Sequence, residues 1–230
     1  MKQYTNTNRF YEDMTGAAVL VQVFTLYFLA LFFFLDPSEA QWLHADPLLK
    51  ILPRQATLWF APVLSLLLLV FWSSIQRPTK AIIANALKHS AYGIAVAIIL
   101  FLTIRFAVGP NLPTFIPPEE SVKPGYLLGM SAGLNEELIF RMVFTPLAFI
   151  AFLKWMRPHS AAMLSILVVA LLFALFHELG SAGEPFSAYY FATRVLMPGC
   201  VMGLAFFYIS PAFIVMMHSA AHIMIPLLFL

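Results

Sequence analysis

Ionisable side chains gather at three points of a sequence that is otherwise strongly apolar. Two adjacent glutamates and an arginine lie in one apolar stretch, one histidine lies near the end of a second, and two histidines lie in a third. Carboxylates and imidazoles that converge away from bulk water can activate a water molecule for attack on a carbonyl group. The residues are Glu136, Glu137, Arg141, His177, His218 and His222.

Helical spacing predicts which of these side chains meet. Glu137 and Arg141 are four positions apart, so they share one helix face and can form an ion pair that shields both charges. Glu136 points about 100° away from Glu137 and is not held by the same arginine. We therefore expect Glu136 to face a cavity as a carboxylate of adjustable basicity, whereas Glu137 has a structural partner.

The histidines are compatible with a metal-free catalytic centre and with a divalent metal centre. His218 and His222 are four positions apart and face the same way, and Phe173 lies one turn before His177, where it can pack beside the imidazole. Glu136, His177, His218 and His222 could supply a zinc site with an open position. The His-Glu-x-x-His pattern of soluble metalloproteases is absent. A metal-free carboxylate centre and a divalent metal centre both remain open at this point.

The elements that position these groups must be membrane helices. Of the 230 residues, 61% are hydrophobic and only 10% are charged, and the mean hydropathy is +0.86. Soluble domains carry about 25% charged residues. This composition excludes a soluble enzyme and a disordered chain, and no basic patch for nucleic acid is present. A single cysteine, Cys200, excludes an intrachain disulfide, and its apolar surroundings predict a buried side chain.

A membrane-crossing helix needs ~20 mostly apolar residues, and seven stretches qualify. We predict an all-α polytopic transmembrane helix bundle in a single membrane domain, 1–230, with an uncleaved first helix and the motifs in the half from about 125 to 230. The fourth stretch is long enough to be tilted or broken, with Pro146 the expected break, which would give eight spans. The stretches are 16–35, 56–75, 90–109, 125–153, 160–180, 186–208 and 211–230.

The short connections between these spans predict an orientation. With a cytoplasmic N-terminus, the inner connections carry seven basic residues and the outer ones carry Lys50, Arg54 and Lys123. Because Lys and Arg are enriched on the cytoplasmic side, we expect this orientation in a cell membrane. The motif residues would then open toward the extracytoplasmic side. The seven are Lys2, Arg9, Arg77, Lys80, Lys88, Lys154 and Arg157.

Three segments together resemble a known family. Glu136-Glu137-Leu138-Ile139-Phe140-Arg141 is similar to the Glu-Glu-x-x-x-Arg motif of the CAAX protease and bacteriocin-processing (CPBP, or Abi) intramembrane endopeptidases. Phe173-Ala174-Leu175-Phe176-His177 matches the Phe-x-x-x-His motif of that family, and His218 matches the histidine of its third motif. The motifs occur in the family's order, each on its own apolar stretch, within about 125–225.

The resemblance implies cleavage of a peptide bond in or beside the membrane, in a prenylated CAAX protein or an exported peptide. It implies that Glu136 is the general base, that Glu137 and Arg141 shape the site, and that His177 and His218 orient the water or stabilise the oxyanion. The third motif usually ends in Asn or Asp, and His222 takes that place here. A small residue commonly follows the motif arginine, and Met142 takes that place.

Other interpretations of the same residues remain. The buried Glu and His groups could form the relay of a proton- or metal-coupled transporter, although no internal repeat of the kind found in transporters is visible. A non-catalytic membrane scaffold is the third alternative. We expect Glu178 at the membrane boundary, Arg105 and Arg194 to extend toward an interface, and His44, His89 and His159 to lie in solvated loops.

Overall fold

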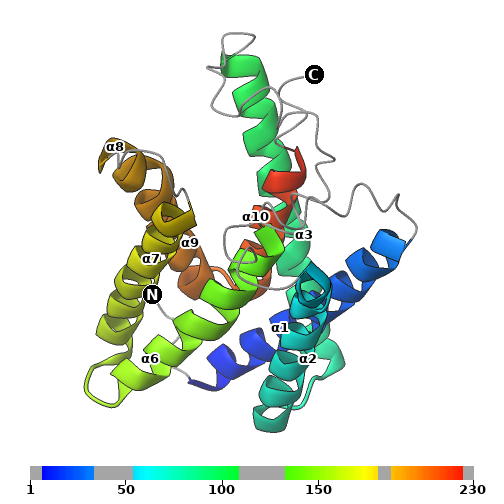
Figure 1. The fold of residues 1–230 in the computed structure, drawn as a ribbon. Coiled ribbons are helices and arrows are strands. Elements are labelled where there is room, and N and C mark those ends of the chain that lie inside the picture. The colour runs from blue at the N-terminus through cyan, green and yellow to red at the C-terminus, as the bar shows by residue number, and fades with distance from the viewer. Residues whose placement is uncertain (1–6, 34–53, 109–132, 181–187, 225–230) are drawn as a thin grey trace.

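The computed structural model describes residues 7–33, 54–108, 133–180 and 188–224, and this part of the chain is helical with no β-strand. Figure 1 shows the helices as a bundle. Along the chain they are α1 (Thr7–Phe33), α2 (Arg54–Ile75), α3 (Lys80–Val108), η4 (Glu137–Phe144), α6 (Thr145–Leu153), α7 (Pro158–Gly180), α8 (Ala188–Tyr190), η5 (Phe191–Leu196), α9 (Met197–Tyr208) and α10 (Pro211–Met224).

The helices follow the apolar stretches expected from the sequence. α8, η5 and α9 run on without a break over the sixth stretch, and α10 covers the described part of the seventh. Residues 125–132 and 225–230, which were expected to belong to the fourth and seventh spans, lie outside the described residues. α3 and α7 are each long and apolar enough to cross a membrane, and the shorter apolar helices are α9, α10 and the part of α2 from Trp59 to Ile75.

Two helices begin earlier than predicted. α1 starts at Thr7 rather than at 16, which places Asp13 inside the helix and buries it. Asn85 of α3 donates a hydrogen bond to the Asp13 carboxylate at 3.4 Å, and Arg9 lies 4.0 Å from it. α3 starts at Lys80 rather than at 90, so His89 is a helical residue, and its Nδ1 atom is buried. The prediction of a solvated loop histidine at 89 was wrong.

The fourth span is continuous from 133 to 153, and Pro146 does not break it. Instead, the helix changes geometry just before the proline. Over η4 it is a π-helix, in which the N–H of Thr145 donates to the carbonyl of Phe140, five residues earlier. The Thr145 hydroxyl donates to the same carbonyl at 2.7 Å. The π-helix ends at Phe144, so Pro146 lies in the first turn of α6, where a proline is tolerated.

The bundle has two groups of helices that meet at the fourth span. α1, α2, α3 and α10 pack together, and α10 makes its most extensive contacts with α3. α6, α7 and α9 form the second group, and η4 contacts α2, α7 and α10. The outward faces of α2, α3 and α7 carry exposed aliphatic and aromatic side chains, among them Leu67, Val70, Ile99 and Leu167. Such faces suit contact with lipid chains.

Glycines allow the closest helix crossings. At Gly93 of α3, an added Cβ atom would lie 2.3 Å from the carbonyl oxygen of Phe213 in α10. At Gly133, an added Cβ would lie 2.7 Å from the Cα atom of Ser219, also in α10. These two crossings fix α10 between α3 and the fourth span. α10 therefore presents its histidines to the glutamates that follow Gly133.

Candidate active site

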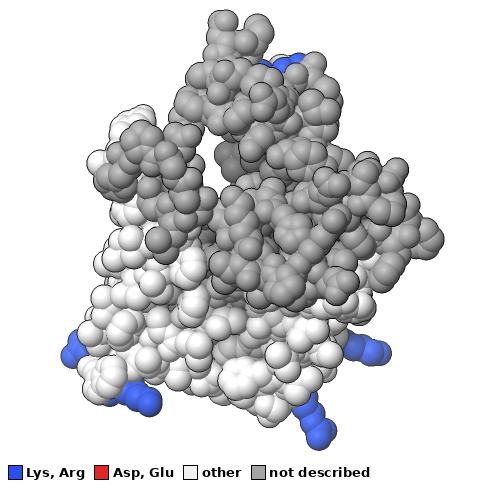
Figure 2. Space-filling view, viewed as in Figure 1, with Lys and Arg blue, Asp and Glu red and all other residues white. Residues whose placement is uncertain are grey.

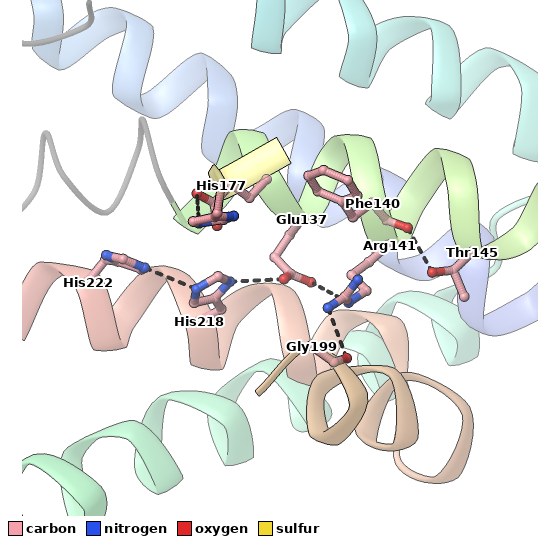
Figure 3. A network of polar contacts seen from close by, with 9 residues as sticks. Glu137, Phe140, Arg141, Thr145, His177, Gly199, His218 and His222 are labelled. Atoms are coloured by element: carbon pink, nitrogen blue, oxygen red, sulfur yellow. Dashed lines mark hydrogen bonds and ion pairs between the residues drawn. The ribbon is translucent and has the colours of Figure 1, made fainter. Parts of the chain in front are cut away.

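Glu137 lies at the centre of the polar network and is completely buried. Its Oε1 atom accepts a hydrogen bond from Nδ1 of His218 at 2.9 Å, and its Oε2 atom lies 3.9 Å from Nε of Arg141. Figure 3 shows these contacts in a line that joins η4, α10 and α9. The ion pair expected from the four-residue spacing is therefore present, and one carboxylate also links two helices.

Arg141 is 1% exposed and its charge has three compensating partners. Besides Glu137, the Nη2 atom donates a hydrogen bond to the carbonyl oxygen of Gly199 at 3.2 Å, and the guanidinium carbon lies 5.5 Å from the centre of the Phe173 ring. Within the described part of the chain, Nε of Arg141 and Oε2 of Glu137 have no hydrogen-bond partner. Arg141 and Glu137 thus attract each other by charge without a bidentate hydrogen bond, and the Gly199 carbonyl fixes the guanidinium group.

Gly199 is a member of the site that sequence reasoning missed. It contributes only a backbone carbonyl, and no side-chain pattern marks such a group. Its lack of a side chain brings α9 against α7, since an added Cβ atom would lie 3.2 Å from the Cβ atom of Ala170. The same close approach puts the carbonyl within reach of Arg141.

Glu136 faces a different helix from Glu137. Its buried carboxylate places Oε1 at 3.5 Å from Nε2 of His177 on α7. His177 in turn donates a hydrogen bond from Nδ1 to the carbonyl of Phe173 at 2.9 Å, and the two rings pack with their centres 4.4 Å apart. The carbonyl can only accept, so the Nδ1 proton of His177 is fixed and Nε2 is turned toward Glu136.

His218 and His222 approach each other through their Nε2 atoms, which are 3.0 Å apart. Because Nδ1 of His218 donates to Glu137, a neutral His218 accepts at Nε2, and His222 must then donate from its own Nε2. This leaves Nδ1 of His222 as an acceptor, and it is buried without a hydrogen-bond partner among the described residues. A chain of fixed proton positions thus runs from Glu137 through His218 to His222.

The structure brings all six residues selected from the sequence into this one region. The side chains of Glu178 and Arg194 lie outside the described residues. Arg105, near the end of α3, is partly buried. His159 is exposed as predicted, but it lies in the first turn of α7 rather than in a loop, with its Nδ1 atom 3.3 Å from the Tyr208 hydroxyl. Cys200 is a free, partly exposed residue of α9, so the prediction that it is buried was only partly correct.

A metal ion could be held by part of the same set. One ligand atom each from Glu136, His218 and His222 lie within 4.8 Å of one another. His218 also donates its other ring N–H to a carboxylate, an arrangement typical of metal-bound histidines. The donor set therefore fits a divalent metal such as zinc, as well as a metal-free centre.

A comparison with protein families gives one match. Residues 118–224 match the model of the type II CAAX prenyl endopeptidase Rce1-like family. This part of the chain, a little under half of its length, is similar to that family. No curated protein and no solved structure gives a significant match. The Rce1-like segment contains every residue of the site and agrees with the resemblance drawn from the three motifs. The matched model describes an endopeptidase.

Proposed function

We propose that this protein is an intramembrane endopeptidase in which Glu136 activates the attacking water. The observation that carries the proposal is the pair of acceptor atoms formed by Oε1 of Glu136 and Nε2 of His177, 3.5 Å apart. A water molecule beside them can donate one hydrogen to each. The carboxylate then takes a proton as the water oxygen attacks the peptide carbonyl, and it returns that proton to the leaving amine.

Glu137 and Arg141 hold the site in this proposal. The buried Glu137 carboxylate fixes the Nδ1 proton of His218, and Arg141 balances the charge of that carboxylate. His218 is the group nearest to Glu137 from α10, and it orients the water or stabilises the oxyanion. His222 supports His218 through the contact between their Nε2 atoms. In this proposal the Glu136 carboxylate reacts, and the Glu137 carboxylate positions His218.

The substrate we propose is a membrane-associated protein or peptide, either a CAAX-type prenylated chain or an exported peptide. The matched family is described as a prenyl endopeptidase, and the motif residues lie in a bundle whose outer faces suit lipid. Seven helices span the membrane in this proposal, α8, η5 and α9 together forming the sixth. The cell (plasma or inner) membrane is the proposed location.

Where a divalent metal is bound, Glu136, His218 and His222 would hold it, and it would supply Lewis-acid polarisation of the carbonyl and of water. His177 would then remain beside Glu136 as a hydrogen-bonding neighbour. The two forms of the proposal differ in one property that can be measured, namely whether a chelator stops cleavage.

The test is proteolysis by the purified protein in lipid vesicles, with a prenylated CAAX peptide and a mixed library of membrane peptides as substrates. The Glu136→Gln variant should cut about 10²–10⁴-fold more slowly, because an amide cannot take the proton. Glu12→Gln is the matched control, since Glu12 is an exposed glutamate of α1, and it should cut like the parent. Equal rates for Glu136→Gln and the parent would contradict the proposal and favour the relay or scaffold interpretation.

A further inference from the structure

An apolar cavity of about 280 Å³ lies beside the candidate active site. Side chains of α1, α3, the fourth span and α10 form its walls, and the fourth span contributes Leu134. Two wall residues of α10 are next to histidines of the site along the chain: Ser219 follows His218, and Ile223 follows His222. The cavity is therefore adjacent to the groups that would act on a substrate.

Ser219 is the polar residue of this wall, and the other lining residues are apolar. It is 4% exposed, and its Oγ atom has no hydrogen-bond partner among the described residues. A helical serine can donate its hydroxyl hydrogen to the carbonyl four residues earlier, as Ser165 of α7 does to Ala161 at 2.7 Å. Because a buried hydroxyl without a partner is unfavourable, the Ser219 hydroxyl points to a ligand that has a hydrogen-bond acceptor.

A second buried polar atom of α10 lies close to Ser219 along the helix. Nδ1 of His222 is an acceptor in the proton arrangement described above, and it also lacks a partner among the described residues. Residues three positions apart on a helix are neighbours, with Cβ atoms about 5–6 Å apart. α10 thus offers a donor and an acceptor in neighbouring positions. The C=O and N–H groups of one residue in an extended peptide point to the same side and match this pair.

We propose that Ser219 and the cavity bind one residue of the peptide substrate, with its backbone against α10 and an apolar side chain in the cavity. The inference rests on the proposed function, because the bound peptide is the substrate. Ser219 donates to the substrate carbonyl, which would otherwise be unsatisfied in apolar surroundings. An isoprenoid chain could also occupy an apolar cavity, but it has no acceptor for the Ser219 hydroxyl.

The cavity reaches the apolar outer surface of the bundle at α3. Ile98 lines the cavity and is 43% exposed, and its neighbours Ile99 and Leu102 are exposed as well. Figure 2 shows, on one face of the molecule, basic side chains mainly along the lower edge and no charged side chain on the described surface in the middle of the view. An apolar peptide segment in the bilayer can therefore reach the cavity at Ile98 through lipid.

Cleavage kinetics in lipid vesicles test the hydroxyl, with a peptide that the parent protein cuts. Ser219→Ala should raise KM about three- to tenfold and change kcat less than about twofold, because only a binding contact is lost. Ser165→Ala is the matched control: it removes a buried hydroxyl whose partner lies in its own helix, and KM should not change. Replacing one substrate amide at a time by an ester should raise KM at one position for the parent but not for Ser219→Ala. An unchanged KM in Ser219→Ala, or additive effects at every position, would overturn the contact.

Photo-crosslinking tests the cavity without cleavage. A CAAX-type peptide, with and without its isoprenoid group, carries benzoylphenylalanine at each apolar position in turn, and cross-links to the Glu136→Gln protein are mapped by mass spectrometry. Both peptides should label residues of the cavity wall. Adding Ile98→Trp should reduce this labelling at least about tenfold, because the indole fills the cavity from its edge. Ile99→Trp is the matched control, since Ile99 is 61% exposed and does not line the cavity, and it should leave labelling unchanged.

The outcomes separate this inference from the proposed function. Cross-links outside the cavity, or labelling of the cavity only by a photoreactive isoprenoid group, would overturn the inference, and cleavage of the peptide by the parent would still support the protease. Cross-links within the cavity, together with no cleavage in vesicles or in detergent, would overturn the proposed function and leave the peptide site in place.

Discussion

The buried pair of Glu137 and Arg141 leads to a quantitative prediction about stability. The two charges lie 3.9 Å apart with side chains that are 0% and 1% exposed. At an effective dielectric constant of about 20, two unit charges at that distance attract by about 4 kcal/mol. Arg141 also loses the Gly199 carbonyl and the Phe173 ring when it is replaced. Arg141→Met should therefore lower the free energy of unfolding by about 3–5 kcal/mol, because it leaves a buried carboxylate uncompensated.

Removing the second charge should restore much of the loss. In Glu137→Gln the amide oxygen can still accept from His218, while the negative charge is gone. The double variant Arg141→Met with Glu137→Gln should therefore regain at least about 2 kcal/mol relative to Arg141→Met alone. The free energy of unfolding is measured by reversible denaturation in mixed micelles for the parent, both single variants and the double variant.

Arg157→Met is the matched control for this cycle. Arg157 is exposed at the turn before α7, so its replacement should change the free energy of unfolding by less than about 0.5 kcal/mol. Two results would refute the reasoning. One is an Arg141→Met protein as stable as the parent, and the other is a double variant whose loss equals the sum of the two single losses.

Three other predictions concern activity. Gly133→Ala should reduce the rate of cleavage at least about tenfold, because its Cβ atom would meet the backbone of α10. Gly203→Ala would meet only an isoleucine side chain and should reduce the rate less. Similar rates for the two variants would show that the crossing at Gly133 does not position the site. His222→Asn should cleave at a rate within about tenfold of the parent, since an amide N–H can still donate to His218. His222→Ala should cleave more slowly than His222→Asn. The opposite order would refute the assigned proton positions. If Glu136 shares a metal with the α10 histidines, a chelator should stop cleavage and added zinc should restore it. If the centre is metal-free, the chelator should leave the rate of cleavage unchanged. Elemental analysis of the purified protein measures the metal content separately.

Much of the helical framework could be predicted because it depends on local properties. Apolar stretches of ~20 residues define membrane helices, and the ends of α2, α7 and α9 agree with prediction within a few residues. The early starts of α1 and α3 were missed because polar residues such as Asp13 continue the helix beyond its apolar part. A hydropathy pattern reports contact with lipid and not the end of a helix.

The contacts within one helix were also predictable, and those between helices were not. Spacing by four residues predicts that Glu137 meets Arg141, and that the two α10 histidines meet. It cannot show that Glu137 is the partner of His218 while Glu136 is the partner of His177, because that depends on how three helices cross. The π-helical geometry of η4 has no clear mark in the sequence.

The π-helical geometry of η4 changes how the fourth span responds to the deletion of a residue. A π-helix contains more residues per turn than an α-helix, so η4 holds surplus chain between the glutamate pair and Thr145. Deleting one residue there would let the segment become α-helical without displacing either end of the span. Glu136, which precedes η4, would then keep roughly its present direction, whereas the same deletion in an α-helical segment would turn it by ~100°. The surplus chain in η4 thus lets the fourth span lose one residue there while Glu136 still faces α7.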